Sequence, residues 1–304
     1  MHDGGLSLSV IVVSWNSGTY LVPLLRQLGG LRDRVPGTEV VVIDNASTDG
    51  TPEIVAAQFP WIRLLRSTEN SGFAAAANRG AAAATGRLML LVNPDISLED
   101  LDALAALLRR AEAATEFGVW GCKLVHGDGT LQSAGERFPS FASIAAEYLG
   151  FARMWRRSSR VAAGFREVDW VSGAFMLVRR ELYEQVGLFS ERFFMYGEDI
   201  DFCVRVRRAG WRVGVFTDYT VIHYHSVGAQ RRLAAMLVHS ARGTLRVMTA
   251  LNGGTLSPGR RLLLRLILSG GAILRGLIRL PLRPRTGIAF LQAGAQILRR
   301  LEVP

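Results

Sequence analysis

Four short apolar runs, each followed by polar residues, constrain the fold of this chain more than any other feature of its sequence. They span Leu8–Val13, Glu39–Ile43, Ile62–Arg66 and Leu88–Val92. Short, continuously apolar and β-branched runs are typical of strands that are buried on both faces. Helical patterns separate these runs, and the unit repeats at intervals of about 25 to 35 residues. This alternation predicts an α/β fold with a Rossmann-like, doubly wound and mostly parallel sheet.

The bulk composition agrees with a folded α/β protein. The chain has 304 residues, of which 49% are hydrophobic and 20% are charged, so it can form an ample core. Cys122 and Cys203 are its two cysteines, and they lack metal-ligand spacing. We therefore expect buried free thiols and a reducing compartment. Residues 1–5 lack a basic region followed by an apolar one, so no signal peptide is predicted.

The positive charge is concentrated in the last quarter of the chain. Residues 231–304 contain thirteen arginines and one acidic residue, for a net charge of +12, whereas residues 1–230 contain 23 basic and 25 acidic groups. The longest apolar stretch of this tail without arginine, Leu266–Leu274, has nine residues, which is too short to span a bilayer. A basic, leucine-rich tail indicates anionic lipid as a partner and argues against nucleic acid.

A helical pattern covers Arg260–Leu280 in this tail. At 100° per residue, Arg261, Arg265, Arg275 and Arg279 fall within about 40° of one line, and leucine and isoleucine cover most of the rest. We expect an interfacial amphipathic helix with cationic edges. Gly270–Gly271 is expected to interrupt it. The alternative is a helix that packs on the domain or forms a dimer interface.

Polar side chains follow three of the predicted strands. Asn16, Asp44 and Asp95 stand at the carboxyl ends of strands, where ligands bind in open α/β sheets. A carboxylate such as Asp44 suits ribose hydroxyls or donors on a base. Gly18 stands alone after the first strand, so the three-glycine dinucleotide fingerprint is missing. A Mg²⁺ or Mn²⁺ ion that bridges Asp95 to a diphosphate would hold a mononucleotide instead. The alternative for Asp95 is an ordinary Pro-Asp turn before a helix capped at Ser97.

Seven sequence blocks in a fixed order resemble the large inverting GT-A glycosyltransferase family, most closely its bacterial rhamnosyltransferase-like branch. The resemblance covers roughly residues 7–230. The blocks are residues 9–16, 44–51, 70–80, 93–95, 170–180, 194–202 and 223–229. The resemblance implies a GT-A catalytic domain over residues 1–230. The charge and leucine content of residues 231–304 predict that a basic, leucine-rich, helical, membrane-associating region follows it.

The resemblance also implies a donor site and a metal site. Asp95 would bind the metal, and Asn93 occupies the first position of the family's usual Asp-x-Asp motif, which removes one charge. Asp44 would contact the base or ribose, and the backbone of Gly72 would lie near the sugar nucleotide. The predicted nucleotide-sugar-binding residues are Ser14, Asn16, Asp44, Gly72, Asn78 and Asn93.

Glu198 and Asp199 are the predicted catalytic pair. Inverting transfer requires a carboxylate that accepts the proton of the acceptor hydroxyl as its oxygen attacks the anomeric carbon. A helix beginning near Glu198 favours an ionised carboxylate there. The resemblance selects Asp199 as the base, whereas Asp201 points elsewhere on the helix and is interpreted as structural. The alternative is a group of acidic residues that only stabilise the helix terminus.

The remaining predicted site residues are two histidines and a turn. His223 and His225 alternate along an extended segment, so they should face opposite sides. Reading back from Gly228 in the family's pattern selects His225 as the metal ligand, although a lone histidine is usually a packed residue. Trp170 and Gly173 belong to a turn that is predicted to bind the acceptor, and an aromatic residue there is as readily part of the core.

These features together predict a metal-dependent inverting glycosyltransferase, peripheral to the cytoplasmic face of the plasma membrane. The resemblance suggests dTDP-L-rhamnose as the nucleotide-diphosphate sugar donor and a polyprenyl-diphosphate-linked glycan of the cell envelope as the acceptor. Galactofuranose and N-acetylglucosamine donors are alternatives, and so is a non-catalytic module that binds a sugar nucleotide or glycan. A homo-oligomer is left open, and no nucleic-acid partner is predicted.

Overall fold

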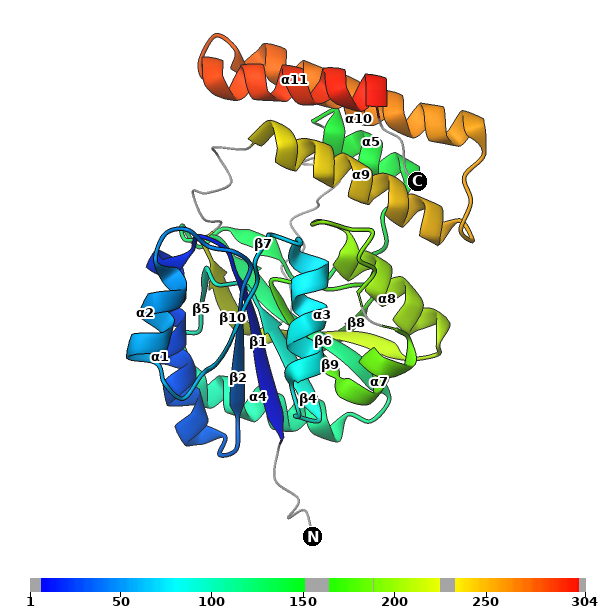
Figure 1. The fold of residues 1–304 in the computed structure, drawn as a ribbon. Helices are drawn as coiled ribbons and strands as arrows, with labels where there is room; N and C mark the ends of the chain where they lie inside the picture. Colours follow the sequence, from blue (N-terminus) through cyan, green and yellow to red (C-terminus); the bar gives the residue numbers. More distant parts are fainter. Residues whose placement is uncertain (1–6, 151–163, 188, 225–232, 301–304) are drawn as a thin grey trace. The chain divides into compact units, whose positions relative to one another are not determined.

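The computed structural model describes residues 7–150, 164–187, 189–224 and 233–300. They form two compact units, an α/β unit and a helical unit (Figure 1). The α/β unit contains residues 7–137, 164–187, 189–194 and 198–224, and the helical unit contains residues 138–150, 195–197 and 233–300. The tail therefore groups with two segments from earlier in the chain, a grouping that the sequence did not suggest.

One sheet forms the centre of the α/β unit. Its strand order is β3-β2-β1-β4-β9-β6-β10-β5, with β7 beside β6 and β8 beside β10. The neighbours from β3 to β4 are parallel, as are β6 and β10, and β9 runs antiparallel between β4 and β6. The predicted mostly parallel, doubly wound α/β fold is confirmed. The strands are β1 Leu8–Ser14, β2 Glu39–Asp44, β3 Arg63–Arg66, β4 Leu88–Val92, β5 Ile96–Ser97, β6 Phe117–Val125, β7 Leu131–Ser133, β8 Phe165–Val168, β9 Phe175–Arg179 and β10 Arg212–His223.

Helices flank this sheet in one unit and pack on one another in the other. The helices of the α/β unit are α1 Gly18–Arg34, α2 Thr51–Gln58, α3 Phe73–Ala83, α4 Leu101–Ala113, α7 Arg180–Gln185 and α8 Glu198–Arg208. Those of the helical unit are α5 Phe141–Tyr148, α9 Leu233–Leu251, α10 Pro258–Arg279 and α11 Pro284–Arg300. The helix α4 is capped by Asp100, whose side chain accepts from Ala103 N, and not by Ser97, which lies in β5.

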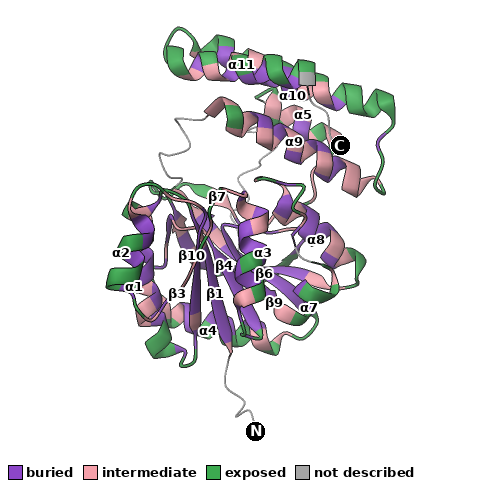
Figure 2. Ribbon diagram, viewed as in Figure 1, coloured by how far each residue is buried: buried purple, intermediate pink, exposed green. Residues whose placement is uncertain are grey.

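The strands β1, β2 and β4 are buried on both faces, as their apolar runs predict, whereas β3, at the edge of the sheet, is partly exposed (Figure 2). Leucines of α1 and α4 form one core cluster with the alternate residues Val10 and Val42. The alanine-rich helix α3 approaches the sheet closely, because a Cβ on Gly80 would lie 2.5 Å from Ile43 and 2.6 Å from Ile11. Small residues in α3 are therefore a packing requirement. Cys122 and Cys203 are free and buried, as predicted.

The last long strand, β10, positions one histidine beside the β4 end. β10 is continuous over Arg212–His223, with a register shift between Phe216 and Thr220. Its end pairs antiparallel with β5, so His223 lies opposite Ile96, and Tyr224 N donates to Asp95 O at 3.0 Å. The pairing of β10 with β5, which the local sequence pattern does not encode, therefore places His223 beside Asp95.

The helical unit has its own core, and α10 runs through it without a break. The predicted interruption at Gly270–Gly271 is wrong, because Gly271 packs where a Cβ would lie 2.6 Å from Tyr148 O. The small and aliphatic residues Leu264, Leu268, Ala272 and Gly276 are buried. They lie on the same side of α10 as its arginines, so the helix buries its narrow, arginine-bearing face.

The arginines of that face bind backbone carbonyls in the helical unit. Arg265 Nε donates to Ile297 O at 3.1 Å, near the carboxyl end of α11. Arg275 donates to Glu147 O and lies over the Tyr148 ring. Cations at helix carboxyl ends satisfy carbonyls that lack an intrahelical partner. Arg265 and Arg275, two of the four arginines predicted to form the cationic edge, therefore have partners within the protein.

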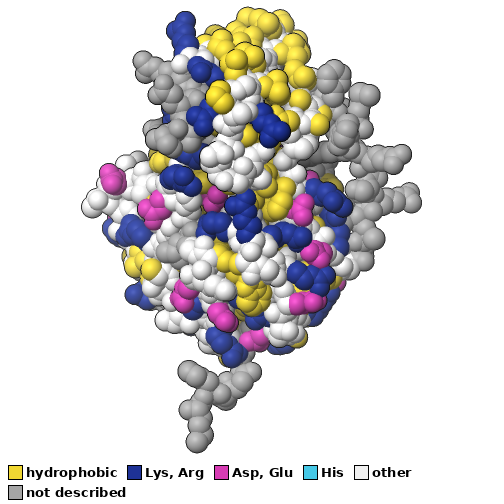
Figure 3. All heavy atoms as spheres, turned by 90° about the vertical axis from the view of Figure 1, so that its right-hand side faces the viewer, with side chains coloured by type: hydrophobic (Ala, Val, Ile, Leu, Met, Phe, Trp, Pro, Cys, Tyr) yellow, Lys and Arg dark blue, Asp and Glu magenta, His cyan; other side chains and the backbone are white. Residues whose placement is uncertain are grey.

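The opposite face of α10 leaves large apolar side chains exposed. Figure 3 shows hydrophobic side chains gathered on the helical unit, with arginines beside them. We call them the leucine face: Leu262, Leu263, Leu266, Leu274, Leu277 and Ile278, which are 41% to 61% exposed. Among the residues that the structure describes, no helix is both long and apolar enough to span a bilayer.

Candidate active site

A cluster of four polar side chains surrounds the turn after β4. His223 Nε2 lies 3.3 Å from Asp95 Oδ1 and 3.3 Å from Asn93 Nδ2. On the other side of the ring, His223 Nδ1 lies 3.1 Å from Gln132 Oε1 on β7. Asp95 is 7% exposed and His223 is 5% exposed. Because an amide oxygen only accepts, the Gln132 contact places a proton on Nδ1, and the neutral ring then has its lone pair on Nε2, which faces both the Asn93 amide and the Asp95 carboxylate.

This tautomer fits a metal ligand. Nδ1 donates to Gln132, which fixes the ring in the way that outer-shell partners fix metal-binding histidines. Neighbouring ligands of an octahedral ion at about 2.1 Å lie about 3 Å apart, close to the 3.3 Å between Asp95 Oδ1 and His223 Nε2. Within the described residues, no three His, Cys, Asp or Glu side chains gather to hold a metal by themselves. The cluster therefore suits an ion whose other ligands are phosphate oxygens and water.

The histidine in this cluster is not the one that the sequence favoured. His225 was selected as the metal ligand, and it lies outside the residues that the structure describes. His223 was the alternative, and the structure brings it to Asp95. Gln132 was missed altogether. It comes from a short hairpin strand, and no motif marks it.

Asp44 carries a carboxylate oxygen without a partner at the end of β2. It is 3% exposed, and its Oδ2 accepts from Ser47 N at 3.2 Å. Its Oδ1 is buried and has no hydrogen-bond partner among the described residues. Leaving a buried acceptor unsatisfied costs about 1–3 kcal/mol. An N–H or O–H of a ligand would remove that cost, which fits the predicted contact with a base or ribose.

Asn16 joins the loops after β1 and β2. Its φ of 49° is in the left-handed region, which asparagine tolerates better than most residues. Asn16 N donates to Ser47 Oγ at 2.8 Å, and its Oδ1 accepts from Thr48 N at 2.7 Å. Asn16 therefore shapes the rim near Asp44. Ser14 is fully buried and shares a 2.8 Å hydrogen bond with Ser17, so its hydroxyl already has a partner within the protein.

A second network joins the β2 end to the start of α3. Asn45 Nδ2 donates to Asn70 Oδ1 and to Gly72 O, and its Oδ1 accepts from Ser71 N. Gly72 has a φ of +86°, and a Cβ there would lie 2.4 Å from Phe194 O. Phe73 N donates to the same Phe194 oxygen at 2.7 Å. The backbone of Gly72, which was predicted to lie near the sugar nucleotide, is thus held against the segment that leads to α8.

Asp199 is held by two backbone donors at the start of α8. Its Oδ2 accepts from Gly173 N at 3.1 Å, and its Oδ1 accepts from Ile200 N at 2.8 Å. Burial raises the pKa of Asp199, and these donors oppose the rise. The predicted acceptor residue Gly173 therefore positions a predicted catalytic residue. A carboxylate fixed in this way, with a raised pKa, has the properties of a general base.

Glu198 differs from its neighbour. It is 6% exposed, and its Oε2 is buried without a hydrogen-bond partner among the described residues. Burial and then the charge of Asp199 raise the pKa of Glu198 to about 8. The two acids titrate as a pair. Because Asp199 has the backbone donors, it is the member that carries the negative charge near neutral pH.

Asn78 is the predicted donor residue whose surroundings argue against that role. Its Nδ2 donates to Phe189 O at 2.9 Å and to Glu191 Oε1 at 3.0 Å. Its Oδ1 accepts from Tyr183 OH at 2.7 Å and from Phe189 N at 3.0 Å. All four hydrogen-bonding positions of this buried amide are thus occupied by the protein. Asn78 joins α3 to the segment after α7 and has no position left for a ligand.

Two further residues have structural partners. Trp170 is half-buried, and its Nε1 donates to Arg137 O at 3.1 Å. Asp201 is buried and pairs with Arg205 at 3.1 Å, which agrees with its interpretation as structural.

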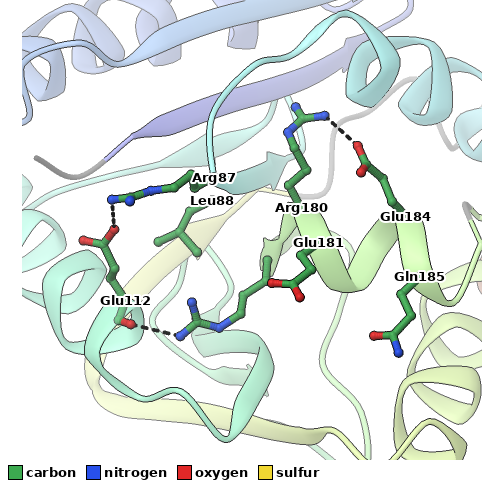
Figure 4. A pocket seen from close by; sticks show the side chains of 8 residues that line it. Arg87, Leu88, Glu112, Arg180, Glu181, Glu184 and Gln185 are labelled. Carbon is green, nitrogen blue, oxygen red and sulfur yellow. Dashed lines mark hydrogen bonds and ion pairs between the residues drawn. The ribbon is translucent and has the colours of Figure 1, made fainter. Parts of the chain in front are cut away.

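One surface pocket lies away from these residues. It has a volume of about 650 Å³ and includes Leu88, the first residue of β4, whereas Asp95 follows the other end of that strand. Its charged groups pair with one another, as in Arg87–Glu112 at 2.7 Å and Arg180–Glu184 at 3.3 Å (Figure 4). Paired charges of both signs give this pocket no preference for a charged ligand.

Known proteins are similar to this chain in sequence and in fold. The profile described as Glycosyl transferase family 2 matches residues 9–187. An N-acetylglucosaminyl-diphospho-decaprenol L-rhamnosyltransferase of Mycobacterium tuberculosis is 30% identical over 243 residues, 73% of this chain and 78% of that enzyme.

Two solved structures have the same fold at low sequence identity. A mannosyltransferase of Pyrobaculum calidifontis, in complex with GDP-Man and Mn²⁺, has a TM-score of 0.60 and 20% identity and covers 97% of this chain and 88% of its own. GalNAc-T7 with UDP, GalNAc and Mn²⁺ has a TM-score of 0.58 and 14% identity, over 81% of this chain and 48% of its own.

Proposed function

Because this chain belongs to glycosyl transferase family 2, we propose that it transfers L-rhamnose from dTDP-L-rhamnose, with inversion, to a polyprenyl-diphosphate-linked glycan of the cell envelope. The mycobacterial relative, named as a rhamnosyltransferase acting on a diphospho-decaprenol acceptor, supports this choice of sugar and acceptor. The observation that carries the proposal is the approach of Asp95 and His223 within 3.3 Å at the end of β4. In an open α/β sheet, that end is where a ligand binds.

Residues after β1, β2 and β4 would bind the donor. Asp44 Oδ1, which is buried without a partner among the described residues, would accept a hydrogen bond from the base or ribose. The Asn16 loop and the Gly72 backbone would shape the space for the nucleotide and sugar. Ser14 and Asn78 would act on that shape from within the protein, because their polar groups already have protein partners.

Asp199 would act as the general base. As the acceptor oxygen bonds to the anomeric carbon, the bond from that carbon to the diphosphate oxygen breaks, and the hydroxyl proton passes to Asp199. The donors Gly173 N and Ile200 N hold the carboxylate in place before the reaction. A raised pKa makes the carboxylate a stronger base.

Asp95 and His223 would hold the divalent cation. When bound, it would neutralise charge on the departing diphosphate. Asn93 adds no charge at the position where the family usually has a second acid, and its contact with His223 Nε2 would give way to the cation. An imidazole nitrogen suits Mn²⁺ better than Mg²⁺, which prefers oxygen ligands. We therefore favour Mn²⁺.

The leucine face of α10 would hold the enzyme on the anionic, cytoplasmic surface of the plasma membrane. An acceptor on a polyprenyl chain stays in the bilayer, so the enzyme must come to it. Six large apolar side chains on one helical face provide area that lipid can bury. The net positive charge of residues 231–304 favours anionic lipid over neutral lipid.

A donor panel tests the proposal. The purified protein would be given dTDP-L-rhamnose or the nucleotide donors of galactofuranose and N-acetylglucosamine, each with a lipid-diphosphate N-acetylglucosamine acceptor and with Mn²⁺, Mg²⁺ or chelator. We expect transfer of rhamnose, fastest with Mn²⁺ and lost with chelator. Transfer of another sugar would correct the donor, and full activity in chelator would refute the role of the metal.

A further inference from the structure

The turn that joins α10 to α11 extends the apolar surface of the helical unit beyond the leucine face (Figure 1). It covers residues 280–284, with the sequence Leu-Pro-Leu-Arg-Pro, and we call it the hairpin tip. Leu282 is 84% exposed, and Leu280 and Pro281 are exposed as well. Leu277 and Ile278 of the leucine face adjoin it at the end of α10. The exposed apolar surface therefore continues from α10 around the tip.

The backbone donors of the hairpin tip have partners within the protein. Residues 281 and 284 are prolines, which have no N–H. The other three residues donate to carbonyl oxygens in the last turn of α10: Leu280 N to Gly276 O at 2.9 Å, Leu282 N to Arg279 O at 3.2 Å and Arg283 N to Arg279 O at 2.7 Å. An N–H without a partner is costly in hydrocarbon, where water cannot accept from it. A turn whose donors are all satisfied can therefore enter lipid where an ordinary loop cannot.

Close packing of α10 on α11 fixes the base of the tip. A Cβ on Gly276 would lie 2.8 Å from Leu291 and 3.0 Å from Gly287 O, and one on Gly287 would lie 2.6 Å from Leu280 Cα. Glycine at both positions lets the two helix backbones meet next to the turn. The tip is therefore presented by a closely packed hairpin, so covering it with lipid costs little conformational entropy.

The charge of the hairpin favours an anionic bilayer as the partner of the tip. Residues 258–300, which include both helices and the tip, contain nine arginines and no acidic residue. Arg283 in the tip and Arg285 in the first turn of α11 are exposed. Long arginine side chains can reach lipid phosphates while neighbouring apolar side chains enter the acyl region. A second copy of this chain would bring the same positive charge to the same surface, and like charges that meet across an interface repel.

We infer that the hairpin tip enters an anionic bilayer beneath the lipid phosphates, with Leu280 and Leu282 in the acyl region and Arg283 at the phosphates. The inference rests on the membrane contact in the proposed function and deepens it, because it names the segment that penetrates the bilayer. The arginine limits the depth of the tip to about 5–10 Å, the depth of interfacial amphipathic helices.

Fluorescence measurements on the full-length enzyme test the position of the tip. Leu282→Cys would be labelled with an environment-sensitive dye, and wild type, in which Cys122 and Cys203 are buried, gives the background labelling. With vesicles that contain phosphatidylglycerol, we expect the emission to shift to the blue and to be quenched by lipids brominated near the top of the acyl chain. Leu131→Cys, at an apolar position of the α/β unit that is 46% exposed, is the matched control and should show neither change.

Substitutions test whether the tip contributes to binding. Leu282→Asn should weaken binding to anionic vesicles about tenfold, because it removes an apolar side chain that lipid would cover. Arg283→Gln should weaken the same binding about fivefold and leave binding to uncharged vesicles unchanged. Leu131→Asn is the matched control. Melting curves without lipid should match wild type for both tip variants, because Leu282 and Arg283 are exposed.

Three outcomes would overturn the inference. If a label on Leu274→Cys of the leucine face enters lipid while the label on Leu282→Cys stays in water, the leucine face binds the membrane without the tip. If the Leu282→Cys label shifts to the blue as the protein concentration rises without vesicles, the tip binds a second copy of the chain. If wild type and Leu282→Asn bind vesicles equally, the tip contributes nothing to binding.

The vesicle measurements need neither donor nor acceptor, so they separate this inference from the proposed function. If the enzyme transfers no sugar but its tip enters lipid, the proposed reaction fails and the insertion of the tip stands. If the enzyme transfers rhamnose to a soluble acceptor while the label on Leu282→Cys stays in water, the insertion fails and the proposed reaction stands.

Discussion

The two units of this protein place their large apolar side chains in opposite ways. In the α/β unit, β1, β2 and β4 are buried almost completely, and polar groups gather where those strands end. In the helical unit, α10 buries Leu264, Leu268 and small residues, while its leucine face is 41% to 61% exposed. The α/β unit completes its own core, and the helical unit leaves an apolar surface for something else to cover.

The two units also differ in their charges. The α/β unit combines acids and bases in pairs and buries Asp44, Asp95, Glu198 and Asp201. The described part of the helical unit has many arginines and one acid. From this contrast we propose a division of labour, with the chemistry in the α/β unit and the contact with lipid in the helical unit. The following predictions test that division, beginning with the largest expected effect.

Replacing the proposed base should nearly abolish transfer. Loss of a general base costs about 10²- to 10⁴-fold in rate, so we expect Asp199→Asn to lower kcat about a thousandfold. The dissociation constant of the donor should stay within a factor of a few, measured by calorimetry with a nucleotide diphosphate. Asp218→Asn, which removes an exposed acid paired with Arg110, is the control. Normal turnover by Asp199→Asn would show that Asp199 is not the general base.

Making the leucine face polar should release the enzyme from lipid without stopping its chemistry. Half-burial of a leucine contributes about 1 kcal/mol, so asparagine at Leu263, Leu266, Leu274 and Leu277 should weaken binding to anionic vesicles about a thousandfold. Turnover of a soluble acceptor should remain near wild type. Ile54→Asn, which changes an apolar residue of the α/β unit that is 36% exposed, should not affect vesicle binding. Unchanged vesicle binding by the fourfold variant would assign the leucine face to another partner.

Removing the proposed histidine ligand should weaken the binding of the metal more than it destabilises the fold. Outer-shell changes typically cost 10- to 100-fold in metal affinity. We expect His223→Ala to weaken Mn²⁺ binding by at least tens of fold and Gln132→Ala by about tenfold. Mn²⁺ titrations in the presence of a nucleotide diphosphate, by activity and by calorimetry, measure both. His126→Ala is the control in the same unit. Wild-type affinity in His223→Ala would leave His225 as the candidate ligand.

The fold could be predicted from sequence because it depends on local patterns. Continuous β-branched runs identify strands covered on both faces, and the residues after them identify Asp44 and Asp95 as strand-end groups. These properties depend on a few neighbouring residues, and the structure places both side chains as that pattern implies.

The parts that sequence reasoning missed depend on contacts between distant segments. His223 reaches Asp95 because β10 continues through a register shift and then pairs with β5. Asn78 is occupied by groups more than 100 residues away in sequence. Gly270–Gly271 was expected to break α10, yet Gly271 gives close contact with Tyr148 and the helix continues. In each case contacts between distant segments, and not the local sequence pattern, determine the structure.

The pH dependence of the free energy of unfolding is the smallest of the expected effects, and it tests a single residue of the α/β unit. The pKa of Glu198 is raised to about 8 from 4.5 by burial and by Asp199. Below pH 4.5 Glu198 is protonated in both states. Between pH 4.5 and 8 the unfolded chain releases this proton and the folded chain keeps it, so the free energy of unfolding falls as pH rises. Above pH 8 Glu198 is ionised in both states, so it lowers the free energy of unfolding no further.

Glu198→Gln cannot ionise, so it should not show this loss. We expect its melting temperature minus that of wild type to grow by a few degrees from pH 5 to pH 8 and then to level off. Tryptophan fluorescence would follow unfolding, and Glu69→Gln, at an exposed position, should run parallel to wild type. A difference that stays constant with pH would mean that Glu198 is ionised at neutral pH in the folded protein. Glu198 would then compete with Asp199 for the role of base, and the division of the two acids into one neutral and one charged member would fail.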